Sequence, residues 1–280
     1  MPPWLTVALI VLASLIALFD IFIFLVATGK RRHMALRPLE NELFAHRGLH
    51  NATRAENSLS AFRAAVEAGY GIELDVRLSK DGELVVFHDD TLERVTDGEG
   101  RVDSYTLAEL RALRLCGTED TIPTFREVLE LVDGRVPLLV EIKEDIFKYA
   151  VTEKCAEHLK DYRGTYIVES FNPLALGRFS KLLPEVPLGI LSFAYTKEKR
   201  YKKLMYALVE LFALNFLSRP DFVAYRHDQW KNPPFRFVRA LFRPALFCWT
   251  VKSAEEERAA REHGFTGIIF EGYDPREEKK

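Results

Sequence analysis

The sequence contains few cysteines and no strong excess of charge of either sign. Its three cysteines, Cys116, Cys155 and Cys248, are odd in number and widely spaced, so they give neither a disulfide framework nor a CxxC metal-binding pair. Redox chemistry is therefore not expected, and a reducing compartment is compatible with the chain. The 39 lysines and arginines nearly balance the 41 aspartates and glutamates. This near-neutrality argues against a nucleic-acid-binding protein.

Three further features are missing. The sequence has no internal repeat, no low-complexity linker beyond residues 28–42, and no glycine-rich phosphate loop after its first predicted strand. The missing loop leaves an open, doubly wound sheet as only the second choice of fold. Apolar residues make up 48% of the 280, which is enough to build a sizeable core.

The N-terminus has an apolar composition of its own. Residues 4–27 contain one ionisable side chain, Asp20. Basic residues follow directly, at Lys30, Arg31, Arg32 and Arg37. A helix of this length spans ~36 Å, enough to cross a hydrocarbon core of ~30 Å with some tilt. We therefore expect residues 1–29 to form a transmembrane anchor; the alternative, a cleaved signal peptide, would carry its positive charge before the apolar stretch.

The flanking charges predict the orientation of this anchor. The lysines and arginines that flank the stretch all lie on its C-terminal side, so the positive-inside rule places residues 30–280 in the cytoplasm. The chain is then a single-pass protein of the cell membrane, with a basic juxtamembrane linker at residues 30–42. Asp20 lies toward the basic end of the span, where its carboxylate can reach the interface.

Beyond residue 42, short apolar runs alternate with stretches of helical periodicity. Eight runs are predicted strands: 43–45, 71–76, 137–142, 166–168, 188–191, 222–224, 245–251 and 267–270. Helical stretches lie between most of them, at 58–68, 124–132, 149–159, 197–217 and 254–263. This alternation predicts an α/β fold, a (β/α)8 TIM barrel over residues 43–280. A small insertion at about residues 80–122, with an extra strand at 83–87, interrupts it after the second strand.

Polar residues gather at the ends of the predicted strands. The run "FAHRG" puts His46 and Arg47 at the C-terminal end of the first strand, the end at which a barrel builds its active site. Glu73 and Asp75 lie two residues apart on the second strand, so their side chains point to the same side. Two carboxylates held side by side repel each other unless a cation or a proton lies between them.

Two more strands add residues to the same end. His88 ends the inserted strand, and Glu141 and Lys143 in "LLVEIK" again lie two residues apart. Three carboxylates favour Mg²⁺ or Ca²⁺ over zinc, and the basic side chains Arg47 and Lys143 suit an anionic substrate. With two histidines, this set fits a phosphodiesterase, in which one histidine activates the nucleophile and the other protonates the leaving oxygen. A simple ion pair between Glu141 and Lys143 is the structural alternative.

Seven short motifs follow one another in a fixed order. They are "AHRG", "ENS", "GIELDVRLSKDGELVVFHDDTLERVT", "IPTFREVL", "VEIK", "ESF" and "WTV", between about Leu43 and Tyr273. Together they resemble the glycerophosphodiester phosphodiesterase family. The resemblance implies a barrel that uses a divalent metal to hydrolyse small-molecule glycerophosphodiesters to glycerol 3-phosphate and an alcohol.

The resemblance also implies roles for particular residues. His46 and His88 resemble the acid/base pair of the family, without settling which is the acid. The implied metal ligands are Glu73, Asp75 and Glu141, and the implied phosphate contacts are Arg47 and Lys143. Glu56 is similar to a position near the metal. Trp249 resembles an aromatic residue of the substrate pocket, with plain core as the alternative.

The chain departs from the family pattern at three positions. Ala55 stands where the family usually has proline, and Lys252 stands where it usually has asparagine. The last strand usually ends in aspartate, whereas this chain offers Glu271. These departures change the shape and charge of the pocket, so the alcohol of the substrate is not inherited from the family.

Two later stretches combine basic and apolar residues. Residues 196–217 join a basic half, with Lys197, Lys199, Arg200, Lys202 and Lys203, to an apolar half too short to span a bilayer. Residues 235–244 interleave phenylalanine with arginine. Both can be helices packed on the barrel, which we favour for the first, or they can contact an anionic lipid surface. In the second case the substrate can be a lipid.

The sequence therefore predicts a membrane-anchored (β/α)8 phosphodiesterase with a cytoplasmic catalytic domain and no nucleic-acid partner. A phospholipase that acts on lysophospholipids or related lipids at the membrane surface is one alternative. A catalytically silent barrel that binds phosphorylated headgroups is the other, and two acid/base histidines speak against it.

Overall fold

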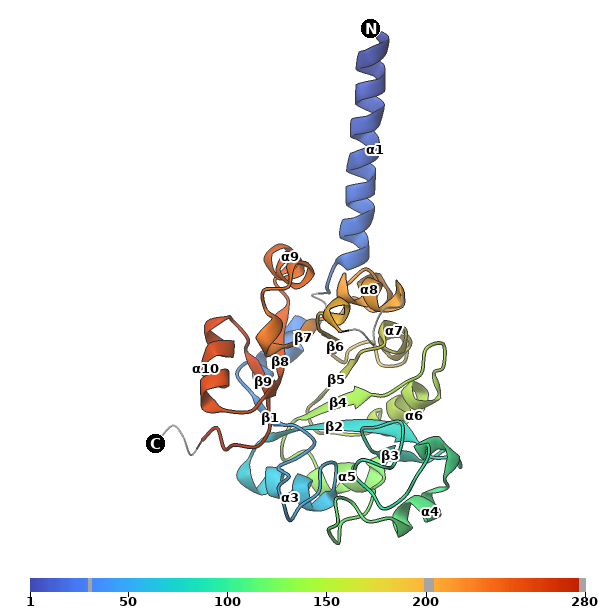
Figure 1. Cartoon of the computed structure of the whole chain (residues 1–280), viewed down its shortest axis with the longest axis vertical. Coiled ribbons are helices and arrows are strands. Elements are labelled where there is room, and N and C mark those ends of the chain that lie inside the picture. Colours follow the sequence, from blue (N-terminus) through green and yellow to red (C-terminus); the bar gives the residue numbers. More distant parts are fainter. Residues whose placement is uncertain (30–31, 199–203, 277–280) are drawn as a thin grey trace.

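Eight parallel strands close into a barrel in the computed structural model, which describes residues 1–29, 32–198 and 204–276 (Figure 1). The strands are β1 (Leu43–Ala45), β2 (Gly71–Leu78), β4 (Leu138–Ile142), β5 (Tyr166–Ser170), β6 (Leu188–Ser192), β7 (Phe222–Arg226), β8 (Ala245–Val251) and β9 (Gly267–Phe270). Strand β1 pairs with both β9 and β2, which closes the ring. The predicted (β/α)8 barrel is confirmed.

The inserted strand lies outside this ring. Strand β3 (Leu84–Val86) pairs antiparallel with β2, with Val86 opposite Val76. It is followed by the 3-10 turn η2 (Val102–Ser104) and the short helix α4 (Leu107–Ala112). Buried residues of this segment, Leu92 and Leu110 among them, form a small apolar cluster of their own with Val85 and Phe87. The insertion can therefore hold its own shape while it carries His88 to the barrel end.

Helices connect the barrel strands. They are α3 (Leu59–Ala68), α5 (Phe125–Val132), α6 (Ala150–Leu159), α7 (Pro173–Leu182), α8 (Leu204–Glu210), α9 (Pro233–Phe242) and α10 (Ala254–Glu262). Side-chain caps begin several of them: the Ser58 hydroxyl accepts from Ala61 N, and Thr124 forms a reciprocal capping box with Glu127. The 3-10 turn η5 (His227–Gln229) precedes α9.

The helix predicted at 197–217 is shorter in the structure. Its described part consists of the end of the 3-10 turn η3 (Tyr195–Lys197), helix α8 and the 3-10 turn η4 (Asn215–Leu217). The basic residues Lys199, Arg200, Lys202 and Lys203 lie outside the described residues, as do Lys30 and Arg31. Phe212 has a left-handed backbone, with φ of 58°, directly after α8, so the chain leaves the helical path there.

The barrel interior is apolar at the end where the strands begin. Phe44, Leu139, Phe222 and Phe247 belong to one buried cluster there. Glycines make room for the rings: a Cβ on Gly189 would lie 2.1 Å from the Phe222 ring. Leu36 and Leu39, from helix α2 (His33–Leu36) and 3-10 turn η1 (Arg37–Leu39), also belong to this cluster. The described part of the predicted linker thus packs against the barrel.

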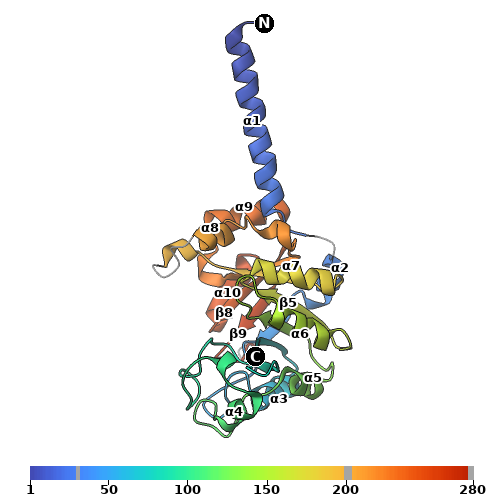
Figure 2. The same ribbon diagram turned by 90° about the vertical axis from the view of Figure 1, so that its right-hand side faces the viewer.

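Helix α1 (Pro3–Val26) stands away from the barrel, with only its C-terminal end near other elements (Figures 1 and 2). Its 24 residues are long and apolar enough to cross a membrane, and the helix is almost entirely unburied. Buried contacts hold the segment that follows: the Arg32 guanidinium pairs with the Asp221 carboxylate at 2.7 Å. Helices α8 and α9 lie beside the base of α1 in both views.

Candidate active site

Three buried carboxylates meet at the C-terminal end of the barrel strands. Glu73 and Asp75 come from β2, and Glu141 comes from β4, where its Cα lies opposite that of Asp75. One carboxylate oxygen from each lies within 4.8 Å of the others, so the group could hold a metal ion. Oxygen ligands of this kind suit Mg²⁺ or Ca²⁺. The three predicted metal ligands are therefore together.

The carboxyl groups of Glu73 and Asp75 differ in the direction of their pKa shifts. Burial raises the pKa of Glu73 well above its usual value, and the nearby Asp75 and Glu141 charges add to the effect. Burial would also raise the pKa of Asp75, but Lys143, His88 and Arg47 hold it well below its usual value. A buried carboxyl group with a raised pKa beside two others is what a site for a divalent cation presents before the cation binds.

Lys143 belongs to the same group. It extends from the end of β4, and its ammonium nitrogen lies 2.6 Å from Glu141 Oε1 and 3.0 Å from Asp75 Oδ1. The Lys143–Glu141 ion pair that the sequence left open is therefore present, as part of a larger cluster. These two carboxylates raise the pKa of Lys143 despite its burial, so the side chain is positively charged at neutral pH.

Arg47 is positioned by a tight turn after β1. Its backbone is left-handed, with φ of 56°, and its backbone N–H donates to Glu73 Oε2 at 2.9 Å. The next residue, Gly48, has φ of 82°, and a Cβ there would lie 2.9 Å from side-chain carbons of Ala61 and Phe62. The turn needs glycine for this reason. It directs the Arg47 guanidinium toward Glu56 at 2.6 Å and Asp75 at 3.5 Å.

His46 forms a pair with Glu271. His46 follows β1 and Glu271 follows β9; these strands are neighbours, and His46 N donates to Phe270 O. His46 Nδ1 lies 2.7 Å from Glu271 Oε2. Burial lowers the pKa of His46 to about 4, although the hydrogen bond with Glu271 opposes this, and the same bond lowers the pKa of Glu271 to about 2. At neutral pH, a neutral His46 therefore donates its Nδ1 proton to a charged Glu271.

His88 has a carboxylate partner as well. Its Nδ1 contacts the Asp89 carboxylate, which also contacts Arg94. Arg94 extends the chain of contacts to Glu56, with Nη2 2.7 Å from Glu56 Oε1. The Phe87 N–H donates to Asp75 O, so the inserted strand places His88 beside the carboxylates. Both predicted catalytic histidines thus have one ring nitrogen held by a carboxylate, which orients the other nitrogen.

Sequence reasoning assigned no role to three residues of this site. Asn57, in the "ENS" motif, donates from Nδ2 to Asp75 Oδ2 at 2.8 Å. Asp89 follows His88 directly. Glu169, in the "ESF" motif, is buried opposite Glu141 on β5, and its Oε2 has no hydrogen-bond partner within the described part of the chain. The motif signalled Glu169, but only strand register shows that it faces the carboxylates.

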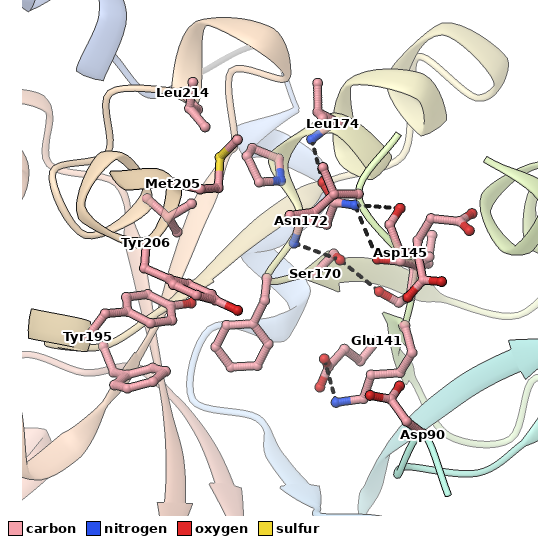
Figure 3. Close-up of a pocket in the computed structure, with 18 of the residues that line it drawn as sticks. Asp90, Glu141, Asp145, Ser170, Asn172, Leu174, Tyr195, Met205, Tyr206 and Leu214 are labelled. Carbon is pink, nitrogen blue, oxygen red and sulfur yellow. Dashed lines mark hydrogen bonds and ion pairs between the residues drawn. The ribbon is translucent and has the colours of Figure 1, made fainter. Parts of the chain in front are cut away.

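A cavity of about 600 Å³ extends from the carboxylates toward α8 (Figure 3). Glu141 and Asp90 lie on one side of it, and Tyr195, Met205 and Tyr206 lie on the other. The rings of Phe171, Phe193 and Tyr195 form a continuous aromatic wall, with neighbouring centroids 6.2 and 3.9 Å apart. One part of the cavity is therefore charged, and the other is aromatic and apolar.

Trp249 packs against the aromatic wall on the side away from the cavity. Its ring meets the Phe171 ring edge-on at 5.5 Å, and its Nε1 donates to Ala224 O at 3.2 Å. It does not line the cavity itself. Glu56 likewise does not belong to the group of three carboxylates. It pairs with the Arg47 guanidinium, which in turn lies beside Asp75.

The departures from the family pattern have structural counterparts. The Ala55 N–H donates to Asp120 Oδ2 at 3.0 Å, a bond that proline could not make. Lys252 Nζ lies 3.3 Å from Glu271 Oε1, so this lysine extends the His46–Glu271 pair.

Comparisons with known proteins point to one family. A sequence model of the glycerophosphoryl diester phosphodiesterase family matches residues 46–274. A glycerophosphodiester phosphodiesterase of Caldanaerobacter subterraneus is 34% identical over 240 residues, covering 81% of this chain and 92% of that protein. The structure of a glycerophosphodiester phosphodiesterase from Thermotoga maritima is 28% identical with a TM-score of 0.63, covering 81% of this chain and 93% of its own. A phosphodiesterase of Oleispira antarctica, solved with the product sn-glycerol-3-phosphate, shares the fold with a TM-score of 0.70 at 24% identity, covering 83% of this chain and 94% of its own.

Proposed function

The chain belongs to the glycerophosphodiester phosphodiesterase family, and on this premise we propose that it uses a divalent cation and two histidines to hydrolyse glycerophosphodiesters. The products are glycerol 3-phosphate and the free alcohol. The observation that carries the proposal is the buried group of Glu73, Asp75 and Glu141, flanked by His46 and His88. The domain division follows: an anchor at residues 1–29, a juxtamembrane segment at 30–42, and the barrel domain at 43–280 with its insertion at about 80–122.

Glu73, Asp75 and Glu141 would hold the cation, Mg²⁺ or Ca²⁺. When bound, it supplies positive charge that polarises the phosphoryl oxygens. Arg47 and Lys143 bind the phosphate oxygens; both are partly buried beside the carboxylates and remain charged. Asn57 keeps the Asp75 carboxylate in place through its hydrogen bond.

The two histidines transfer the protons. One takes a proton from the attacking oxygen, and the other gives a proton to the alcohol oxygen as its bond to phosphorus breaks, so that one water is consumed per diester. Glu271 and Asp89 each hold one ring nitrogen and thus fix the tautomer. His46, with its pKa lowered to about 4, is neutral at pH 7 and suits the role of base.

One observation favours a second candidate, a lysophospholipid or related lipid as substrate. The cavity continues from Lys143 past Phe171, Phe193 and Tyr195 to Met205 and Val209. A water-soluble headgroup such as choline or ethanolamine does not need so long an apolar wall, whereas an acyl chain would bury its methylene groups there.

A substrate panel separates these candidates. The full-length chain is purified in detergent, and release of glycerol 3-phosphate from glycerophosphocholine, glycerophosphoethanolamine and glycerophosphoglycerol is compared with release of choline from lysophosphatidylcholine. The first candidate predicts metal-dependent release from the soluble diesters that is lost in His46→Ala and His88→Ala. Turnover of the lysophospholipid alone supports the second candidate. No turnover of any substrate by the folded, metal-loaded chain would favour a silent, headgroup-binding barrel.

We further propose that α1 anchors the enzyme in the cell membrane with its catalytic domain in the cytoplasm. The length and composition of α1 support the anchor, and the basic residues after it support the orientation. A periplasmic reporter enzyme fused after Lys280 should stay inactive, while a cytoplasmic fluorescent reporter at the same site should work. The reverse pattern would overturn the orientation, and release of the processed chain from membranes would indicate a signal peptide.

A further inference from the structure

The C-terminal end of α1 packs on two elements of the barrel domain. The Phe22 ring lies 5.6 Å from the Phe237 ring of α9, and the Phe24 ring lies 6.2 Å from the Phe216 ring of η4. Arg219 donates from Nη1 to Phe24 O at 2.7 Å, and its guanidinium lies 4.4 Å from the centre of the Phe24 ring. These contacts fix the position of α9 and η4 along the axis of α1, which we call their height.

That height corresponds to the membrane boundary. Phe22 lies four residues, about 6 Å along the helix axis, before Val26, the last residue of α1. The last turn of a transmembrane span of this length lies at the boundary between the hydrocarbon core and the lipid headgroups. Because Phe237 and Phe216 contact Phe22 and Phe24, they lie at the same level.

Exposed apolar side chains continue outward from this point. On α8, Leu204 is 76% exposed, Leu208 is partly exposed, and Leu211 just after the helix is 43% exposed. Their spacing of four and three residues puts them on one face. On α9, Phe237 is 37% exposed and Leu241, one turn later, is 50% exposed. In water such a set of side chains is costly, and it marks an interaction surface.

Basic side chains accompany the apolar ones. Arg236 and Arg243 are exposed at the two ends of the Phe237–Leu241 face of α9, and Arg219 lies at the base of α1. A helix with an apolar face and arginines beside it is typical of segments that lie in the headgroup layer of an anionic membrane.

We propose that these elements form a membrane-facing surface, consisting of Leu204, Leu208, Leu211, Phe216, Phe237 and Leu241, which lies in the headgroup layer of the membrane that α1 crosses. The inference rests on the proposed anchor, since α1 sets the height of the surface. Its occupant is the bilayer itself, because the transmembrane helix emerges directly beside it (Figures 1 and 2).

The surface is joined to the active-site cavity by α8. Met205, Tyr206 and Val209 of this helix line the cavity, and by helical spacing they lie opposite the Leu204–Leu208–Leu211 face. One wall of the cavity is therefore the inner side of a helix whose outer side contacts lipid. The apolar end of the cavity lies next to the bilayer, so a substrate with an apolar chain can enter from the membrane.

Fluorescent labels placed at single cysteines test the surface. The full-length chain is reconstituted in nanodiscs of phosphatidylcholine and phosphatidylglycerol, with and without lipids that carry a quencher close to the headgroup or, for the label in the middle of α1, at the end of the acyl chain. Labels are placed at Leu211→Cys and at Leu241→Cys in a Cys116→Ser background. A Leu12→Cys label reports the anchor, and the natural, exposed Cys116 in the insertion serves as the control outside the membrane.

The proposal predicts blue-shifted emission and quenching by lipid at positions 211 and 241, with neither effect at Cys116. If lipid quenches a label at position 12 but not those at 211 and 241, the anchor stands and the surface is wrong. A blue shift at 211 and 241 without lipid quenching would mean that protein covers the surface, and it overturns the proposal as well. If no position responds to lipid, the anchor itself fails.

Discussion

His46 and Glu271 form the pair of residues on which the proposed proton transfer depends. The carboxylate holds the Nδ1 proton of the imidazole, which leaves Nε2 free to accept a proton. The family usually has aspartate at the end of the last strand. In this chain the longer Glu271 side chain stands at that position, and it also reaches Lys252.

Replacing Glu271 tests this role. Glu271→Gln keeps the shape of the side chain, but its amide can donate to Nδ1 and so favour the wrong tautomer of His46. We expect kcat to fall roughly 100- to 10,000-fold, with little change in KM or in thermal stability. Steady-state kinetics with a soluble diester measures this, and Glu262→Gln on the exposed side of α10 is the matched control. A kcat within twofold of the wild type would contradict the role.

The protonation of His46 gives a second prediction at this scale. Burial lowers its pKa to about 4, from an ordinary value of 6.5 in the unfolded chain. On acidification, His46 is protonated in the unfolded chain at a higher pH than in the folded chain. The neutral, buried His46 therefore does not reduce the free energy of unfolding above about pH 6.5, and it reduces it increasingly as the pH falls toward 4. An NMR titration of the imidazole nitrogens, assigned with His46→Asn, should show a neutral ring at pH 5.5. A ring that is half protonated near pH 6.5 would contradict the account.

At the scale of elements, the juxtamembrane segment packs against the barrel domain. Arg32 and Asp221 form a buried ion pair, and Asp221 Oδ2 also accepts from Leu188 N at the start of β6. A few residues later, Leu36 and Leu39 fill the base of the barrel. This segment therefore belongs to the folded domain rather than acting as a flexible tether.

Breaking that ion pair should destabilise the whole domain. Arg32→Met leaves the Asp221 carboxylate buried without its charged partner, and we expect the free energy of unfolding to fall by about 3–5 kcal/mol. Arg37→Met, on the exposed side of the same segment, should change it by less than about 0.5 kcal/mol. Denaturant unfolding of both variants in detergent measures the difference, and equal stabilities would show that the segment contributes little to the fold.

The elements also show what the sequence reveals and what it does not. All eight barrel strands were predicted, because each is a short apolar run between polar turns. Helix α7, by contrast, was not predicted, and it contains a glycine at position 177. For the segment of α9, which begins with two prolines, the sequence left open a helix packed on the barrel or a contact with lipid. The packing of Leu36 and Leu39 was hidden as well, since a basic, irregular segment resembles a linker.

The active site, too, could be predicted from the sequence only in part. The family motifs singled out the five residues proposed for metal ligation and acid/base catalysis, and these residues do lie together. Glu169 and Asp89 received no role, because their importance depends on which strand or side chain lies beside them. Short-range patterns contain no such information, whereas the barrel closure brings β5 beside β4 and β9 beside β1.

At the scale of the whole molecule, a phosphodiesterase site lies in the same chain as an apolar helix long enough to cross a membrane. The cavity begins at buried carboxylates on the barrel axis and ends at α8, beside the base of α1. A lipid substrate at the membrane surface would thus be bound by its phosphate at the charged end, with its acyl chain directed along the aromatic wall. We propose above all that the three carboxylates bind the divalent cation on which hydrolysis depends.

Metal titration combined with activity tests that claim most directly. The full-length chain is stripped with chelator, and binding of Mg²⁺ and Ca²⁺ is measured by calorimetry, with glycerol 3-phosphate release followed on the same samples. We predict one cation per chain, activity that returns as the site fills, and loss of both in Asp75→Asn, while Glu67→Gln on the exposed face of α3 retains both. Full activity in the stripped chain, or unchanged cation binding by Asp75→Asn, would contradict the account.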